Sequence, residues 1–274
     1  MNSRDLEKLM GGYMVANNYF PIPEEVAISA DCAGVPLFDE PIVGVCAADD
    51  PLFTEFLKPE VIGPHHTLPS FWLEGARSVI SCFFPSSEPV RESNRGGAEP
   101  SNEWLHARYE GQKAIDQAAF YLVTHLRMQG GQAVAPSLDK RFKAGHEGFP
   151  FTSNWSERHA AYACNLGTFS LTKGFITDRR GMAGRFFSVI TDVEITPDAR
   201  QKRDAYANCT KCGICAAACP AGAISLENGK DHALCSAYLK KMGASYSPRY
   251  GCGNASAAHP AKKQGRSAEN WAYH

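Results

Sequence analysis

Apolar positions along this chain recur with two spacings, one typical of helices and one typical of strands. Residues 3–19 carry apolar side chains at near-helical intervals after a possible cap at Ser3. The same spacing over residues 101–128 predicts a long helix, capped by Ser101 and ended by a glycine pair. Its predicted apolar face comprises Trp104, Leu105, Ile115, Ala119, Leu122, Val123 and Leu126.

Short apolar runs between turn residues predict buried strands, and the clearest of them lie at residues 42–46 and 78–84. The segment from Asn154 to Glu157 resembles a capping box that opens a helix. Residues 85–100 are rich in proline and glycine and predict a surface loop. The remaining predicted elements are a helix over 51–57, a helix over 154–164, and β-rich stretches over 132–135, 169–177 and 185–195.

Strands and helices alternate throughout, which predicts an α/β or α+β fold in which helices cover a sheet. No internal repeat is evident. The polar residues 197–203 lack any apolar pattern, so we place a domain boundary there. We expect a sheet-and-helix domain over residues 1–200 and a smaller domain over residues 201–274.

Composition is that of an ordinary globular protein, with 44% hydrophobic and 21% charged residues among 274. The net charge of −1 provides no overall basic field for nucleic acid. The first residues lack the apolar core of a signal peptide, and no apolar run approaches the length of a membrane span. We therefore expect a soluble, cytoplasmic protein without membrane contact.

The ten cysteines are distributed unevenly along the chain. Six of them lie between residues 209 and 252, a crowding that in a reducing compartment indicates metal ligands rather than disulfides. The others are expected to be small, buried, apolar side chains. These scattered cysteines are Cys32, Cys46, Cys82 and Cys164.

A continuous run of four cysteines, followed by Pro220, has the ligand pattern of a [4Fe–4S] ferredoxin. Three thiolates from one tight loop can hold one cluster, and in two-cluster ferredoxins the fourth ligates the other cluster. Zinc is the alternative, although zinc sites favour two separated cysteine pairs. The run comprises Cys209, Cys212, Cys215 and Cys219.

Six cysteines are too few for two complete clusters. If the first three hold one cluster, Cys219, Cys235 and Cys252 remain for the second. Each cluster then needs a fourth ligand from outside this set. His259 is the nearest nitrogen donor, and the alternative for His259 is a solvated residue of the tail.

Several motifs resemble those of epoxyqueuosine reductases, which share a core with reductive dehalogenases. The matching segments are residues 77–80, WSERHAAYACNLG at 155–167, GRFFSVITD at 184–192 and CSAYL at 235–239. The resemblance spans most of residues 70–255. It implies a cobamide-binding domain followed by a two-cluster ferredoxin domain that delivers electrons to the cobalt.

Three departures from this family change the expected function. Ala255 and His259 stand where the family has cysteines. No acid occurs in residues 151–156, where the family places a catalytic aspartate, and the tRNA-gripping helical repeats do not follow before His274. The resemblance therefore implies the scaffold rather than the reaction on tRNA, and we do not expect tRNA as a partner.

A turn rich in glycine and arginine is the candidate site for the phosphate of a cobamide. Gly181 and Gly184 would let backbone amides approach it, with Arg185 beside them. The alternative is a plain β-turn with solvated arginines. No residue stands out for proton delivery, since each candidate in the matching helix has a structural alternative. These candidates are Glu157, His159 and Tyr162.

We therefore expect an iron–sulfur oxidoreductase that uses a cobamide to reduce a small molecule. The sequence does not identify this substrate, and a low-potential reductant or an electron-donor protein would be a partner. The rival hypothesis is a ferredoxin-like carrier that reduces the corrinoid of a partner. A third is a scaffold whose second cluster has degenerated.

Overall fold

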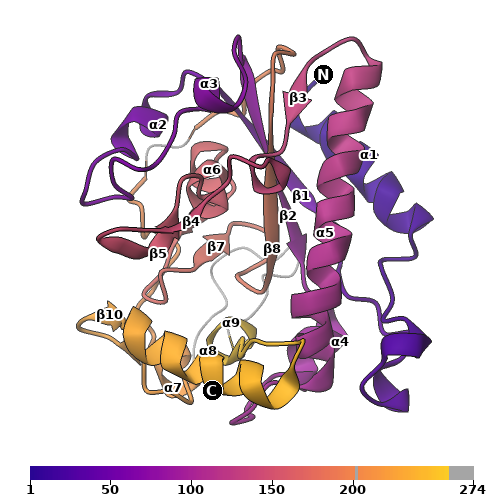
Figure 1. The fold of residues 1–274 in the computed structure, drawn as a ribbon, viewed down its shortest axis with the longest axis vertical. Coiled ribbons are helices and arrows are strands. Elements are labelled where there is room, and N and C mark those ends of the chain that lie inside the picture. Colours follow the sequence, from indigo (N-terminus) through magenta and orange to yellow (C-terminus); the bar gives the residue numbers. More distant parts are fainter. Residues whose placement is uncertain (201–202, 259–274) are drawn as a thin grey trace.

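The computed structural model describes residues 1–200 and 203–258, and its centre is a four-stranded sheet (Figure 1). The strand order is β1-β2-β8-β3, and all three pairings are antiparallel. The fold is therefore α+β, because no parallel crossover joins these strands. The strands are β1 (Ile42–Ala47), β2 (Ser78–Pro85), β8 (Gly184–Thr191) and β3 (Ala133–Val134).

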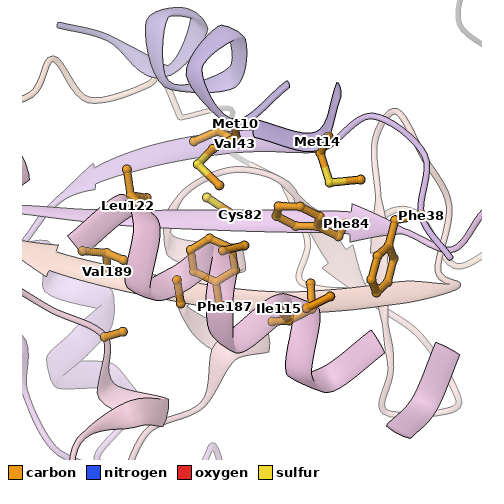
Figure 2. Close-up of a cluster of buried hydrophobic side chains, with 14 of the residues drawn as sticks. Met10, Met14, Phe38, Val43, Cys82, Phe84, Ile115, Leu122, Phe187 and Val189 are labelled. Carbon is orange, nitrogen blue, oxygen red and sulfur yellow. The ribbon is translucent and has the colours of Figure 1, made fainter. Parts of the chain in front are cut away.

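Helices α1 (Ser3–Ala16) and α5 (Asn102–Met128) cover one face of the sheet with a large apolar core (Figure 2). Alternate residues of the strands point into it, as Cys82, Phe84, Phe187 and Val189 do. The Ser101 hydroxyl accepts a hydrogen bond from the Trp104 amide at 3.1 Å, which confirms the predicted cap of α5.

The opposite face of the sheet is covered by α6 (Glu157–Ala163) and a second apolar cluster. Trp155 is 1% exposed within this cluster and stacks on Phe53 with ring centroids 5.8 Å apart. Short helices α2 (Pro51–Glu55) and α3 (Pro69–Trp72) complete this layer. Two hairpins flank it, made of β4 (Ala144–His146) with β5 (Phe149–Ser153), and of β6 (Gly167–Phe169) with β7 (Phe175–Thr177).

The C-terminal residues form a small module at the end of the sheet where α5 and β8 begin (Figure 1). A hairpin of β9 (Ile224–Ser225) and β10 (Gly229–Lys230) follows α7 (Ile214–Ala217). Arg249 fixes the module to the larger body, since its guanidinium lies 2.9 Å from the Glu110 carboxylate. The remaining helices of the module are α8 (His232–Tyr246) and α9 (Asn254–Ala257).

Three local predictions are wrong. Residues 85–100 are not all loop, because Ser87 caps a helix, α4 (Glu88–Ser93), with Pro89 in its first turn. Asn2 rather than Ser3 caps α1. The capping box at Asn154 does not form, because the Asn154 side chain binds the backbone of Arg141 and Lys143 instead.

The short 3₁₀ helices are η1 (Glu24–Val26), η2 (Ala30–Cys32) and η3 (Pro136–Leu138).

In the part of the chain that the structure describes, no helix is both long enough and apolar enough to cross a bilayer.

Candidate metal centres and cofactor site

The first three cysteines of the run line one hollow in the C-terminal module. Cys209, Cys212 and Cys215 all contribute to its lining. Lys211 and Gly213 both have positive φ, 54° and 81°, which curls the loop so tightly that successive cysteines face the same space. The rest of the lining is largely apolar and includes Leu171, Ile176, Met182 and Ile214.

The other three cysteines form a second group, drawn from three different segments. Cys219 follows α7, Cys235 lies in α8 and Cys252 precedes α9. Burial raises the pKa of the Cys252 thiol, and the neighbouring sulfurs of Cys219 and Cys235 raise it further. The Ala223 amide donates a hydrogen bond to the Cys219 sulfur at 3.3 Å, a contact that stabilises a thiolate ligand.

The thiols that influence one another divide into the same two groups. Burial also raises the pKa of Cys215, and the sulfurs that add to this effect are those of Cys209 and Cys212. Within residues 1–200 and 203–258, no group of three or more His, Cys, Asp or Glu side chains converges on a single ion. Thiolates of a cubane bind different irons and need not converge in this way.

The four scattered cysteines are confirmed as buried apolar residues. Cys32, Cys46, Cys82 and Cys164 are at most 3% exposed and belong to the cores on either side of the sheet. The sulfurs of Cys46 and Cys164 lie 3.4 Å apart beneath α6. His259 lies outside the described residues, so its predicted role as a ligand stays a prediction.

Local backbone geometry and packing explain the glycines of the turn before β8. Gly181 has φ 74° and closes a turn in which its carbonyl accepts from the Thr177 amide at 2.9 Å. A Cβ on Gly184 would lie 2.4 Å from the Phe83 ring. Arg179 and Arg180 form ion pairs with Glu7 and Glu40. The phosphate-binding role of Gly181 and Gly184 stays a prediction.

Arg185 differs from the other arginines of this turn because it lies in a desolvated place beside another cation. Burial first, and then the guanidinium of Arg108 in α5, lower the pKa of Arg185 to about 9. The Arg108 guanidinium lies over the Tyr250 ring, 4.9 Å from its centroid. Two neighbouring cations between the sheet and the C-terminal module form a place that favours an anion.

Glu157 is a titratable group whose environment sequence reasoning did not foresee. Burial raises the pKa of its carboxyl to about 7, and the nearby Ser188 hydroxyl offsets only part of this rise. Both its oxygens, and the hydroxyl of Ser81, lack a hydrogen-bond partner among the described residues. Ser81 and Ser188 face each other across β2 and β8, and Ser188 accepts from the Trp155 ring N–H at 2.8 Å.

The other two candidate proton donors of this helix, His159 and Tyr162, pack against aromatic rings. The His159 ring lies between Phe56 and Phe169, with centroids 4.9 and 4.7 Å away, and burial lowers its pKa to about 3. Tyr162 packs on the same Phe169 ring at 5.6 Å. A neutral imidazole that stays neutral at ordinary pH cannot deliver a proton by titrating there.

Comparison with known families identifies the cysteine run. The family model for a 4Fe–4S binding domain matches residues 206–225. The segment is thus of the iron–sulfur type, as predicted, and not of a zinc type. No curated protein matches the chain.

Among solved structures, the chain is similar to both families that the sequence motifs resemble. Epoxyqueuosine reductase with a tRNA-Tyr stem loop shares 14% identity over 88% of this chain and 58% of that one, with a TM-score of 0.48. The enzyme from Bacillus subtilis shares 15% identity over the same fractions, with a TM-score of 0.44. A reductive dehalogenase shares 18% identity over 72% of this chain and 27% of that one, with a TM-score of 0.46. This chain thus spans little more than half the length of the epoxyqueuosine reductases.

Proposed function

We propose that this protein is an iron–sulfur oxidoreductase whose C-terminal module holds two clusters and which reduces a small molecule with the help of a cobamide. The observation that carries the proposal is the division of six cysteines into two separate groups. One group lines an apolar hollow, and the other is gathered from three segments of the module. Two thiolate sets in one small module are what a two-cluster ferredoxin needs.

The residues between the sheet and the module suit the anionic part of a cobamide. Arg185 and Arg108 are adjacent cations in a desolvated place, and Tyr250 adds a flat ring beside them. These three residues would bind the phosphate of the nucleotide loop. When bound, the cobamide would supply a strongly nucleophilic reduced cobalt.

Glu157 is our candidate for the proton that a reductive step consumes. A carboxyl with a pKa of about 7 is partly protonated at neutral pH and can both give and regain a proton. Glu157 follows the segment where the related family carries an aspartate and this chain carries none. The orphaned Ser81 hydroxyl, opposite Ser188 in the sheet, is a further polar group that a bound ligand or water would satisfy.

The test begins with the metal content of anaerobically purified, reconstituted protein. We expect iron and sulfide for two clusters, a brown colour, and a shifted corrin spectrum on titration with cobalamin. Arg185→Gln should weaken cobalamin binding at least tenfold without loss of iron. Arg179→Gln is the matched control, because Arg179 is paired with Glu7 and should leave binding unchanged. Intact clusters with no cobalamin binding would overturn the cobamide part of the proposal.

A ferredoxin-like carrier is the second candidate, and the exposure of the first cysteine group favours it. Cys212 is exposed, and the neighbouring Ile214 is 40% exposed. A cluster so close to the surface can exchange electrons with another protein. If the cobalamin titration fails while both clusters are present, transfer of electrons to a separate corrinoid or flavin protein becomes the better account.

A further inference from the structure

The C-terminal module contains an internal repeat that its sequence conceals. Gly213 and Gly253 both adopt the left-handed conformation, with φ and ψ of 81° and −7° in one and 69° and −9° in the other. Each glycine follows a cysteine and opens a four-residue helix. The helices α7 and α9 pack against each other. The two segments are therefore copies of one cluster-binding turn.

The hydrogen bonds of the two turns agree bond for bond. The carbonyl of Gly213 accepts from the amides of Ala216 and Ala217, both at 3.0 Å. The carbonyl of Gly253 accepts in the same way from Ser256 and Ala257, at 2.9 and 2.8 Å. This register aligns Cys252 with Cys212.

The same register places Ala255 where Cys215 stands in the first copy. Cys215 is a member of the first cysteine group, whereas Ala255 carries no ligand atom. Cys252, three residues before Ala255, belongs to the second group, with Cys219 and Cys235. The second copy thus lacks the thiolate that would complete this group.

We propose that the cluster bound by Cys219, Cys235 and Cys252 has one iron without a protein thiolate, at the position of Ala255. This iron is open to an exogenous ligand: water, hydroxide, or an oxygen or sulfur donor of a small molecule. The inference rests on the proposed function to the extent that it requires an iron–sulfur cluster at this group, but it does not require a cobamide.

Hydrogen bonds around α9 hold the backbone near Ala255 in place. The Asn94 side chain donates to the Cys252 carbonyl at 2.9 Å, and Arg95 donates to the Ala257 carbonyl at 3.1 Å. The buried Asn254 side chain donates to the Gly97 carbonyl. Its amide is therefore already used, and the backbone on both sides of Ala255 is held in place.

An iron that lacks a thiolate leaves the cluster more readily than its three neighbours. Mild oxidation with ferricyanide should convert [4Fe–4S]²⁺ into [3Fe–4S]⁺, with release of one Fe²⁺ and transfer of one electron to the ferricyanide. Addition of Fe²⁺ and a reductant should reverse this step. The paramagnetic three-iron cluster is visible by electron paramagnetic resonance.

The decisive variant is Ala255→Cys, which restores the thiolate of the first copy. We expect ferricyanide to release iron and produce the three-iron signal in the reconstituted wild type, and Ala255→Cys to release about one iron fewer per protein, because only the second cluster regains its thiolate. Ser256→Cys is the matched control, since it adds a thiol to the same helix at the position of Ala216, which is not a ligand. This control should behave as the wild type does.

The outcomes separate this inference from the proposed function. If wild type and Ala255→Cys release the same amount of iron, the open iron is not at Ala255 and the inference falls, while the proposed function stands. If the wild type releases no iron and gives no three-iron signal although it holds two clusters, the second cluster is fully ligated and the inference also falls. If no iron is bound at all, the proposed function itself fails.

Discussion

The buried carboxyl of Glu157 should make the protein less stable as the pH rises. Burial raises its pKa from 4.5 to about 7, so the folded protein keeps a proton that the unfolded chain has already released. Since the unfolded state binds fewer protons between these two values, the free energy of unfolding falls across that window and is level above it. At about 1.4 kcal/mol per pKa unit, the full loss is roughly 3 kcal/mol at about pH 8.

Glu157→Gln removes the ionisable group and keeps the shape of the side chain. The difference in unfolding free energy between variant and wild type should therefore move in the variant's favour by roughly 3 kcal/mol from about pH 4.5 to about pH 8. For a protein of this size, that is a relative gain of roughly 6–12 °C in melting temperature. Anaerobic urea and thermal unfolding of both proteins across this pH range measure the difference, in which pH effects common to both cancel.

Asp139→Asn is the control of opposite sign. The hydrogen bond from the Arg141 side chain is the main cause that lowers the pKa of Asp139 from 3.8 to about 2. The contribution of the Asp139 carboxylate to stability is complete above about pH 4 and is lost only as the pH falls towards about 2. The difference in unfolding free energy between Asp139→Asn and the wild type should therefore stay constant from about pH 4.5 to about pH 8. If the difference in unfolding free energy between Glu157→Gln and the wild type is also constant across this pH range, the carboxyl is not desolvated. The argument for its raised pKa would then be refuted.

Three further predictions concern ligation and packing. Cys212→Ser should abolish the cluster of the first group and disorder much of the module, because ligation and folding are coupled; iron content and circular dichroism measure both effects. Gly184→Ala should cost about 1–3 kcal/mol in urea unfolding, because its Cβ would lie 2.4 Å from the Phe83 ring. Ser101→Ala should cost about 1 kcal/mol in the same assay, because the Trp104 amide loses its cap; an unchanged midpoint would contradict the capping role.

Local patterns determine much of the fold, and they predicted it correctly where one signal dominated. The strands β1 and β2 are apolar runs buried on both faces, and α5 has both a cap at Ser101 and a regular apolar face. α4 was missed because the composition of residues 85–100 suggested a loop, although Ser87 and Pro89 suit a helix start. The false capping box at Asn154 failed because a long-range contact with Arg141 and Lys143 competes for the same side chain.

Some features of the candidate site could likewise be predicted from local sequence, whereas others depend on residues far apart in the chain. The spacing of Cys209, Cys212 and Cys215 predicted one group directly, because the three lie in a single loop. The environments of Glu157 and Arg185 depend on neighbours from other elements, and no local pattern encodes their burial. The internal repeat was not recognised from the sequence, because two of its ligand positions hold Ala255 and His259 rather than cysteines.

The two cysteine groups differ in their exposure and in their neighbours, and this difference favours electron transfer within the chain. The first group includes the exposed Cys212 and is therefore accessible to an external donor. The second group is tied to the body, because Asn94 binds the Cys252 carbonyl and Tyr250, two residues earlier, lies against Arg108. A carrier needs only an accessible cluster, and the first group alone would meet that need. A second group fixed next to the cationic pair of Arg108 and Arg185 is instead what a reductase requires, since electrons that enter at the surface must reach a site inside the protein.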